Sequence, residues 1–152
     1  MARLGGELSL ALVERLVAKT GGSPMLLRLA VGQLCDSGAD PAEFVNRLET
    51  QPQVAAYLLD TVLGSLGPAT RRLAALLSVF RQPADLYDET LIELGQAADG
   101  PYDHAAAVDD LHRLHVVEDP ARAQLHRLLR GQVYAALAPE PARRRGVLRL
   151  CL

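Results

Sequence analysis

Residues 116–126 read VVEDPARAQLH, and this stretch decides whether the chain is predicted to be a plain helical bundle or to contain a winged helix. The β-branched pair Val116-Val117 is followed by the turn dipeptide Asp119-Pro120, and Ala-Gln-Leu-His comes next in an alternating pattern. Such a pattern is typical of two short strands joined by a turn. We therefore predict one short β-hairpin, with strands near Val116 to Glu118 and Ala123 to His126 and a tip near Pro120.

On both sides of this stretch the hydrophobic residues recur at the spacing of amphipathic helices. The composition agrees, because 29 leucines and 23 alanines stand against one isoleucine in 152 residues. Ser23-Pro24 and Asp40-Pro41 each pair a capping residue with a proline, which is a helix-start signal. Gly21-Gly22 is expected to end the preceding helix, and Gly95 to end a short helix that begins at Tyr87. The predicted fold class is mainly α: a small helical bundle followed by a winged-helix domain.

The predicted domain boundary lies in the polar stretch from Glu49 to Gln53, which has no apolar residue. We expect a helical lid subdomain at 1–50, a winged-helix domain at 53–140, and the start of a following helical region at 141–152. The apolar residues near the C-terminus lack a predicted partner surface within the chain. We therefore expect the chain to be part of a longer protein.

Charge and composition argue against several classes of function. The net charge of −2 and the pI of about 6.1 do not suit a general polyanion binder. An aromatic content of 4% without tryptophan disfavours a stacking surface for single-stranded nucleic acid. The sequence has no signal-peptide pattern and no run of 18 apolar residues, so we expect a cytoplasmic protein with no membrane partner.

Signals of catalysis and metal binding are also absent from the sequence. It has no G-x-S-x-G, C-x-x-C or H-E-x-x-H motif, and its two cysteines fit no ligand pattern. His112 and His115 have helical spacing, but His104 lies well upstream and no further ligand follows a zinc pattern. Histidines near a helix C-terminus, where they suit the helix dipole, are the better interpretation. We predict no catalytic residue and no metal site.

Two segments resemble one protein family. Residues 16–30, LVAKTGGSPMLLRLA, resemble the glycine-x-proline segment of the signal-transducing NTPases with numerous domains, which include bacterial NB-ARC-type regulators. Residues 58–80 and residues 124–130, QLHRLLR, are similar to the winged-helix domain and the histidine motif of that family. The matches follow the order of the family and cover nearly the whole chain.

The resemblance implies a nucleotide site shared with another domain. By analogy with this family, Pro24 of the Gly22-Ser23-Pro24 segment would pack against the adenine of the nucleotide. His126 would reach a phosphate of ADP and hold the resting state closed. Eukaryotic relatives commonly flank this histidine with Met and Asp, where this chain has Leu125 and Arg127. The predicted cofactor-binding residues are Gly22, Pro24 and His126.

The expected function is therefore that of a regulatory lid and winged helix in a nucleotide-dependent signalling switch. The chain has no G-x-x-x-x-G-K-[ST] loop, so we expect it to be no enzyme and to bind no cofactor by itself. ATP or ADP would be held by a P-loop domain outside this chain. That domain and a helical-repeat sensor of the same parent protein are the expected partners, with an oligomer on activation.

Two alternatives remain. The first is a winged-helix transcription regulator, but its reading helix, from Asp103 to Leu114, would present Asp109 and Asp110 beside Arg113. An acidic helix repels the DNA backbone, so we expect no specific nucleic-acid binding. The second alternative is a helical protein-interaction module, which would be favoured if no nucleotide-binding domain accompanies the chain.

Overall fold

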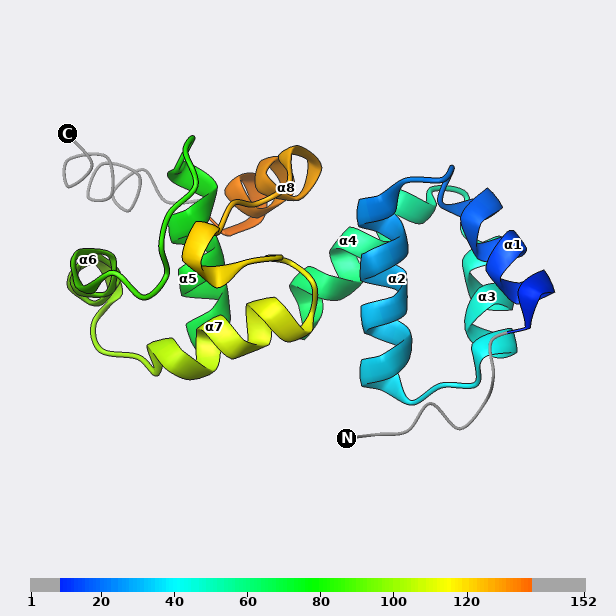
Figure 1. The fold of residues 1–152 in the computed structure, drawn as a ribbon, viewed down its shortest axis with the longest axis horizontal. Coiled ribbons are helices and arrows are strands. Elements are labelled where there is room, and N and C mark those ends of the chain that lie inside the picture. The colour runs from blue at the N-terminus through cyan, green and yellow to red at the C-terminus, as the bar shows by residue number, and fades with distance from the viewer. Residues whose placement is uncertain (1–8, 138–152) are drawn as a thin grey trace. The chain divides into compact units, whose positions relative to one another are not determined.

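The computed structural model describes residues 9–137, which are mainly helical, as predicted (Figure 1). In this part of the chain a short 3₁₀ turn, η1, precedes the last of the α-helices. The elements are α1 (Leu10–Lys19), α2 (Pro24–Ser37), α3 (Pro41–Glu49), α4 (Val54–Ser65), α5 (Pro68–Val79), α6 (Glu89–Asp99), α7 (His104–Arg113), η1 (Pro120–Arg122) and α8 (Arg127–Leu137).

Local capping explains where most of these helices begin. The Ser23 hydroxyl accepts a hydrogen bond from the amide of Leu26, and Pro24 occupies the first turn of α2. Asp40 caps α3 in the same way by accepting from the amides of Ala42 and Glu43. Both predicted helix starts are thus confirmed. The same kind of cap precedes three further helices, where the capping residues are Ser9, Asp88 and Asp103.

The chain divides into two compact units, residues 1–64 and 65–152, called unit 1 and unit 2 below. This division falls at the last residue of α4, whereas the boundary predicted from the sequence lies at 50–53. The reason is that α4 belongs to the core of unit 1: Leu58 is fully buried there, and its carbonyl accepts a 2.7 Å hydrogen bond from Gln33 Nε2 of α2. The expected start of a further helical region at 141–152 lies outside the described residues.

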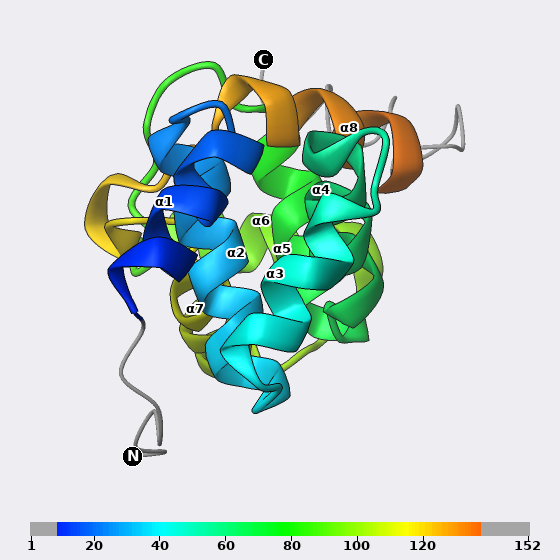
Figure 2. The same ribbon diagram turned by 90° about the vertical axis from the view of Figure 1, so that its right-hand side faces the viewer.

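Unit 1 is built from α1 to α4, with α1 and α3 packed side by side (Figure 1). Figure 2 shows the same helices from another direction. Each helix turns its leucines, valines or phenylalanine inward, as the helical spacing of these residues predicts. The buried cluster contains Leu16, Leu26, Ala30, Leu34, Phe44, Val45, Leu48 and Leu58.

In unit 2, α5 packs against α6, α7 and α8 (Figure 1). Its inward residues are completely or almost completely buried, as expected for a central helix. The facing helices contribute leucine and valine side chains of the same kind. The main buried residues are Leu73 and Leu77 of α5, Val108 and Leu111 of α7, and Leu129 and Val133 of α8.

The predicted hairpin does not form, and the described residues contain no strand, only a single antiparallel bridge between Ala84 and Ala123. The amides of Val116 and Val117 both donate to the carbonyl of Leu111, at 3.0 and 3.2 Å, in a turn that closes α7. The expected tip at Pro120 is instead the 3₁₀ turn η1. The amides of Val116 and Val117, which a hairpin would pair with the second strand, are therefore already used.

The bridge joins segments that are far apart in the sequence. The amide of Ala84 donates to the carbonyl of Ala123 at 2.9 Å, and the amide of Ala123 donates back at 2.7 Å. The amide of Leu86 donates to the carbonyl of Pro120 at 2.9 Å. The connection between α5 and α6 is thus held to the segment that follows α7, which takes the place of the predicted local pairing.

Gly95 does not end a helix as expected, because α6 runs from Glu89 to Asp99 and ends at Gly100, whose φ is 80°. A Cβ atom at Gly95 would lie 2.6 Å from the hydroxyl oxygen of Tyr102. Glycine is present here because the tyrosine approaches the helix backbone closely.

Candidate functional site

The predicted nucleotide-binding segment forms a tightly closed turn between α1 and α2. Gly21 and Gly22 have φ values of 62° and 69°, in the left-handed region that favours glycine. The amide of Gly22 donates to the carbonyl of Val17 at 2.9 Å and that of Gly21 to Ala18 at 3.3 Å, which is the Schellman arrangement. The two glycines thus end α1 and turn the chain toward Ser23 and α2.

The buried side chain of Thr20 holds the same turn from the inside. Its hydroxyl donates to the carbonyl of Leu16 at 2.9 Å and lies 3.2 Å from that of Val17. The amide of Ser23 donates to the carbonyl of Thr20 at 3.1 Å. Pro24 follows as an exposed first residue of α2. The turn therefore presents the apolar ring of Pro24 at the surface. Several hydrogen bonds hold the backbone of this turn in place.

His126 stands directly before α8, where it caps the helix. Its carbonyl accepts from the amide of Arg130 at 2.8 Å, and its Nδ1 accepts from the amide of Leu128 at 3.3 Å. These are the contacts of an N-cap residue. Because Nδ1 accepts, the neutral ring carries its hydrogen on Nε2. His126 is exposed, so this N–H group is a donor at the surface of unit 2.

The predicted site residues therefore fall into two places. Gly22 and Pro24 belong to one turn of unit 1, whereas His126 belongs to unit 2. Pro24 and His126 each lie at a helix N-terminus, where backbone N–H groups give a partial positive charge, whereas Gly22 ends α1. A negatively charged group is favoured at either terminus, and His126 adds a side-chain donor to the second one.

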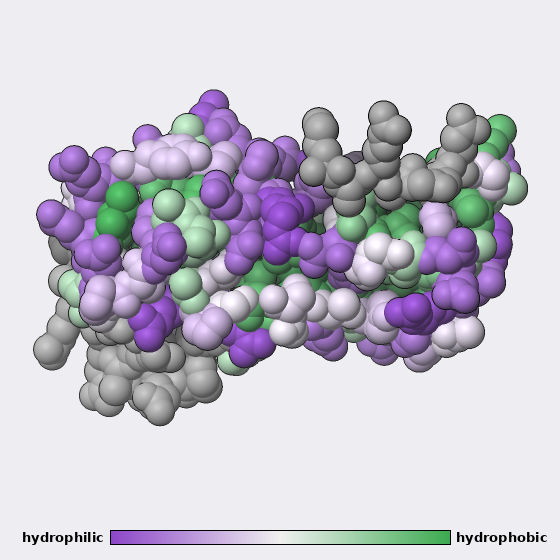
Figure 3. Space-filling view, turned by 90° about the horizontal axis from the view of Figure 1, so that it is seen from below, coloured by the Kyte–Doolittle hydropathy of each residue, from purple (hydrophilic) through white to green (hydrophobic). Residues whose placement is uncertain are grey.

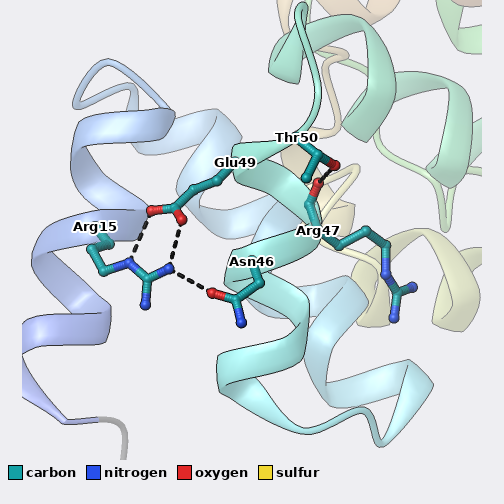
Figure 4. A network of polar contacts seen from close by, with 5 residues as sticks. All are labelled: Arg15, Asn46, Arg47, Glu49 and Thr50. Atoms are coloured by element: carbon teal, nitrogen blue, oxygen red, sulfur yellow. Dashed lines mark hydrogen bonds and ion pairs between the residues drawn. The ribbon is translucent and has the colours of Figure 1, made fainter.

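Sequence reasoning missed a polar network between α1 and α3 (Figure 4). Arg15 Nε donates to Glu49 Oε1 at 2.9 Å, and its Nη2 donates to Glu49 Oε2 at 2.6 Å and to Asn46 Oδ1 at 2.6 Å. The hydrogen bonds from Arg15 lower the pKa of the Glu49 carboxyl below its usual value and raise the pKa of the guanidinium. No local pattern links these residues, since they are distant in the sequence and become neighbours only when the helices pack.

A second polar chain ties the start of α7 to the connection after α5. His104 Nε2 donates to the carbonyl of Leu86 at 2.7 Å, so Nδ1 accepts from the Tyr102 hydroxyl at 2.9 Å. Both nitrogens of this ring have partners within the protein, which gives His104 a structural role. Among residues 9–137, no group of three or more His, Cys, Asp or Glu side chains is placed to hold a metal ion.

Two acidic residues at α7, Asp103 and Asp110, also have structural partners. Asp103 caps the helix by accepting from the amide of Ala106. Asp110 accepts from the Thr70 hydroxyl of α5 at 3.1 Å and from Arg113 Nη2 at 3.1 Å. The one arginine of this helix is therefore paired with a carboxylate of the same helix.

The surface shown in Figure 3 has separate hydrophobic areas (green) among hydrophilic residues (purple). None of the helices within residues 9–137 has both the length and the apolar character needed to cross a bilayer. Comparisons of the chain with protein-family models, with curated proteins and with solved structures find no match.

Proposed function

We propose that this chain is the regulatory lid and winged-helix portion of a nucleotide-dependent signalling switch. Its units would close over ADP or ATP held by a P-loop domain outside the chain, and a helical-repeat sensor would control the opening. The proposal rests on the family resemblance of residues 16–30 and 124–130 and on the geometry at Pro24 and His126.

The observation that carries the proposal is that the two nitrogens of the His126 ring have different roles. Nδ1 caps α8 by accepting from the amide of Leu128, and this leaves the Nε2–H group as a donor at the surface. The N-terminus of α8 adds the favourable end of the helix dipole. A phosphate oxygen is an acceptor with negative charge and fits both features.

The turn before α2 supports the nucleotide role of unit 1. A purine base offers a flat apolar face, and the exposed ring of Pro24 offers a matching one. The Schellman bonds of Gly21 and Gly22 and the buried hydroxyl of Thr20 restrain the backbone beside it. A restrained contact loses little conformational entropy when the base binds.

The order of elements in unit 2 supports its assignment as a reduced winged helix. After α5, the connecting segment pairs with the segment after α7 through the Ala84–Ala123 bridge, and α8 closes the unit. In this assignment the backbone pairing would take the place of the small sheet of a winged helix. The pairing of Arg113 with Asp110 on α7 speaks against the alternative of direct DNA reading, which needs free cationic donors toward bases and phosphates.

The proposal is tested by ADP release from the parent protein that contains the P-loop domain. His126→Ser keeps a capping oxygen for the amide of Leu128 but removes the Nε2–H donor. A hydrogen bond to a charged group contributes about 1.5–3 kcal/mol, so ADP dissociation is expected to accelerate roughly ten- to a hundredfold. The melting temperature should stay close to that of the unmodified protein.

Pro24→Ala is the companion variant, because alanine also begins a helix well but lacks the ring. It should weaken nucleotide affinity without unfolding α2. Calorimetric titration of ATP into residues 1–152 alone should give no micromolar binding, since the phosphate loop is missing. Unchanged ADP release in His126→Ser, or micromolar ATP affinity of the isolated chain, would contradict the proposal.

A further inference from the structure

The charged residues of unit 2 are segregated along the chain. Residues 82–112 contain eight Asp or Glu residues and no Lys or Arg, whereas residues 120–137 contain three arginines and no Asp or Glu. The first segment includes α6 and the second includes α8, and these helices pack on different sides of α5 (Figure 1). Opposite charges are therefore presented on different sides of the same unit.

Two pairs of side chains define the surfaces that carry these charges. Glu89 and Glu93 are exposed and one turn apart on α6, and they are called the acidic surface below. Arg127, which is exposed, and Arg130, which is half-buried, are one turn apart on α8 and are called the basic surface. Residues three or four apart on a helix have Cβ atoms about 5–6 Å apart. The two carboxylates and the two guanidinium groups are therefore spaced alike, and each carboxylate can pair with one guanidinium group.

Packing within the unit does not explain these four side chains. None of them has a hydrogen-bond or ion-pair partner among residues 9–137. Arg127 and Arg130 lie in the first turn of α8, at the positive end of the helix dipole, where cations are unfavourable. Like charges one turn apart on a helix also repel each other. An external group of opposite charge would relieve this repulsion at both surfaces.

We propose that unit 2 binds a second copy of this chain, with the acidic surface of one copy on the basic surface of the next. Within one copy the two surfaces lie on different sides of α5, so they do not pair with each other. Both complementary halves are present in the same chain, which favours a second copy over an unrelated acidic partner. The net charge of −2 gives little overall repulsion between copies. This association does not depend on the proposed nucleotide role.

Each surface also has a large exposed apolar side chain beside its charges. Tyr87 precedes α6 and is 63% exposed, and Leu128 lies between the two arginines in the sequence and is 45% exposed. Docking would remove apolar area from water at both positions. Exposed ion pairs add specificity more than affinity, so the association is expected to be weak. Because the two surfaces differ, it is heterologous and continues beyond a dimer.

Sedimentation equilibrium of residues 1–152 over a range of concentrations tests the proposal. A reducing agent is present because Cys35 is exposed. We expect association at an ionic strength of about 0.01 M, where the Debye length is about 30 Å, and a monomer at about 1 M, where it is about 3 Å.

Two double variants each remove one surface without a change in helix propensity, since glutamine forms helices as well as glutamate or arginine does. E89Q/E93Q and R127Q/R130Q should each weaken association about tenfold or more, because both close charge pairs are lost. Their equimolar mixture still contains one intact acidic and one intact basic surface, so it should form dimers and nothing larger. Arg47→Gln, which removes an exposed arginine of α3 in unit 1, is the matched control and should associate as the unmodified chain does.

A variant with both surfaces reversed, E89R/E93R/R127E/R130E, should associate again, which a merely structural role of these residues does not predict. Circular dichroism melting curves check that each variant is folded. A monomeric unmodified chain at low salt would overturn the proposal and leave the basic surface to another anionic partner, such as a nucleic acid. Association that survives either double variant, or a mixture that stays monomeric, would also overturn it.

Discussion

The close approach of Tyr102 to Gly95 predicts an unusual response to an alanine substitution. Glycine inside a helix normally costs about 1 kcal/mol relative to alanine, so Gly→Ala at such a position usually stabilises a protein. At Gly95 the new methyl group would lie 2.6 Å from the Tyr102 hydroxyl oxygen and 3.3 Å from its Cε1. We therefore expect Gly95→Ala to destabilise unit 2.

The magnitude follows from three contributions. Forcing extra volume into a packed site costs about 1–3 kcal/mol. Moving the Tyr102 ring also breaks its 2.9 Å hydrogen bond to His104, which adds about 1 kcal/mol and offsets the gain in helix propensity. The net loss in free energy of unfolding is then about 1–3 kcal/mol. For a unit of this size the melting temperature should fall by roughly 4–8 °C for each kcal/mol.

Thermal unfolding followed by circular dichroism measures the effect, with Gly64→Ala in α4 as the matched control. A Cβ atom at Gly64 meets no heavy atom within 4 Å, so this change should stabilise by about 0.4–1 kcal/mol. In a Tyr102→Phe background the clashing oxygen is gone, and Gly95→Ala should cost much less. An equal effect in both backgrounds, or a stabilised Gly95→Ala protein, would refute the steric argument.

Three further substitutions test other local features. His115 closes α7 with a φ of 56°, so His115→Gly should stabilise unit 2 by about 1 kcal/mol in urea denaturation, whereas an unchanged midpoint would show that the backbone is unstrained. The pKa of Glu49 is lowered by Arg15, so its stabilising contribution is present above the usual value of 4.5 and is lost as the pH falls through the lower folded value. Glu49→Gln should therefore destabilise unit 1 at pH 7 and flatten its acid unfolding profile, which a pH series of melting curves would measure. Asp88 accepts from the amides of Thr90 and Leu91, so Asp88→Ala should cost about 1 kcal/mol and Asp88→Ser should restore most of it in the same urea assay.

The accuracy of the sequence predictions depends on how local each feature is. Ser23-Pro24 and Asp40-Pro41 predicted helix starts correctly because a cap and its amide partners lie within three residues of each other. Gly21-Gly22 was correctly placed after a helix for the same reason. Helix termini of this kind depend on neighbouring residues alone, so the sequence contains the full signal.

The errors arose where a distant partner decides the structure. Ala123 pairs with Ala84, from which α6 and α7 separate it in the sequence. No alternation of residues near Pro120 could reveal that partner. Glycine often ends helices, but at position 95 glycine is required because the hydroxyl of Tyr102 lies close to the helix backbone. In both places the local pattern was compatible with more than one structure, and tertiary packing selected between them.

For the candidate site, the sequence suggested the residues but not their surroundings. It placed Pro24 at a helix start, yet gave no sign that the Thr20 side chain restrains the turn from the interior. It singled out His126 through a family resemblance, whereas the capping role of Nδ1 depends on the geometry before α8. The assignment of the Nε2 hydrogen follows from that geometry.

The Ala84–Ala123 bridge also bears on how unit 2 opens. Closing a loop of this length costs entropy that only the assembled helices can offset, so the bridge should form late in folding. The amides of Ala84 and Ala123 should consequently exchange with deuterium when this single bridge opens, which needs less free energy than unfolding the whole unit. Two alanines without any polar side chain thus become natural reporters of the partial opening of unit 2.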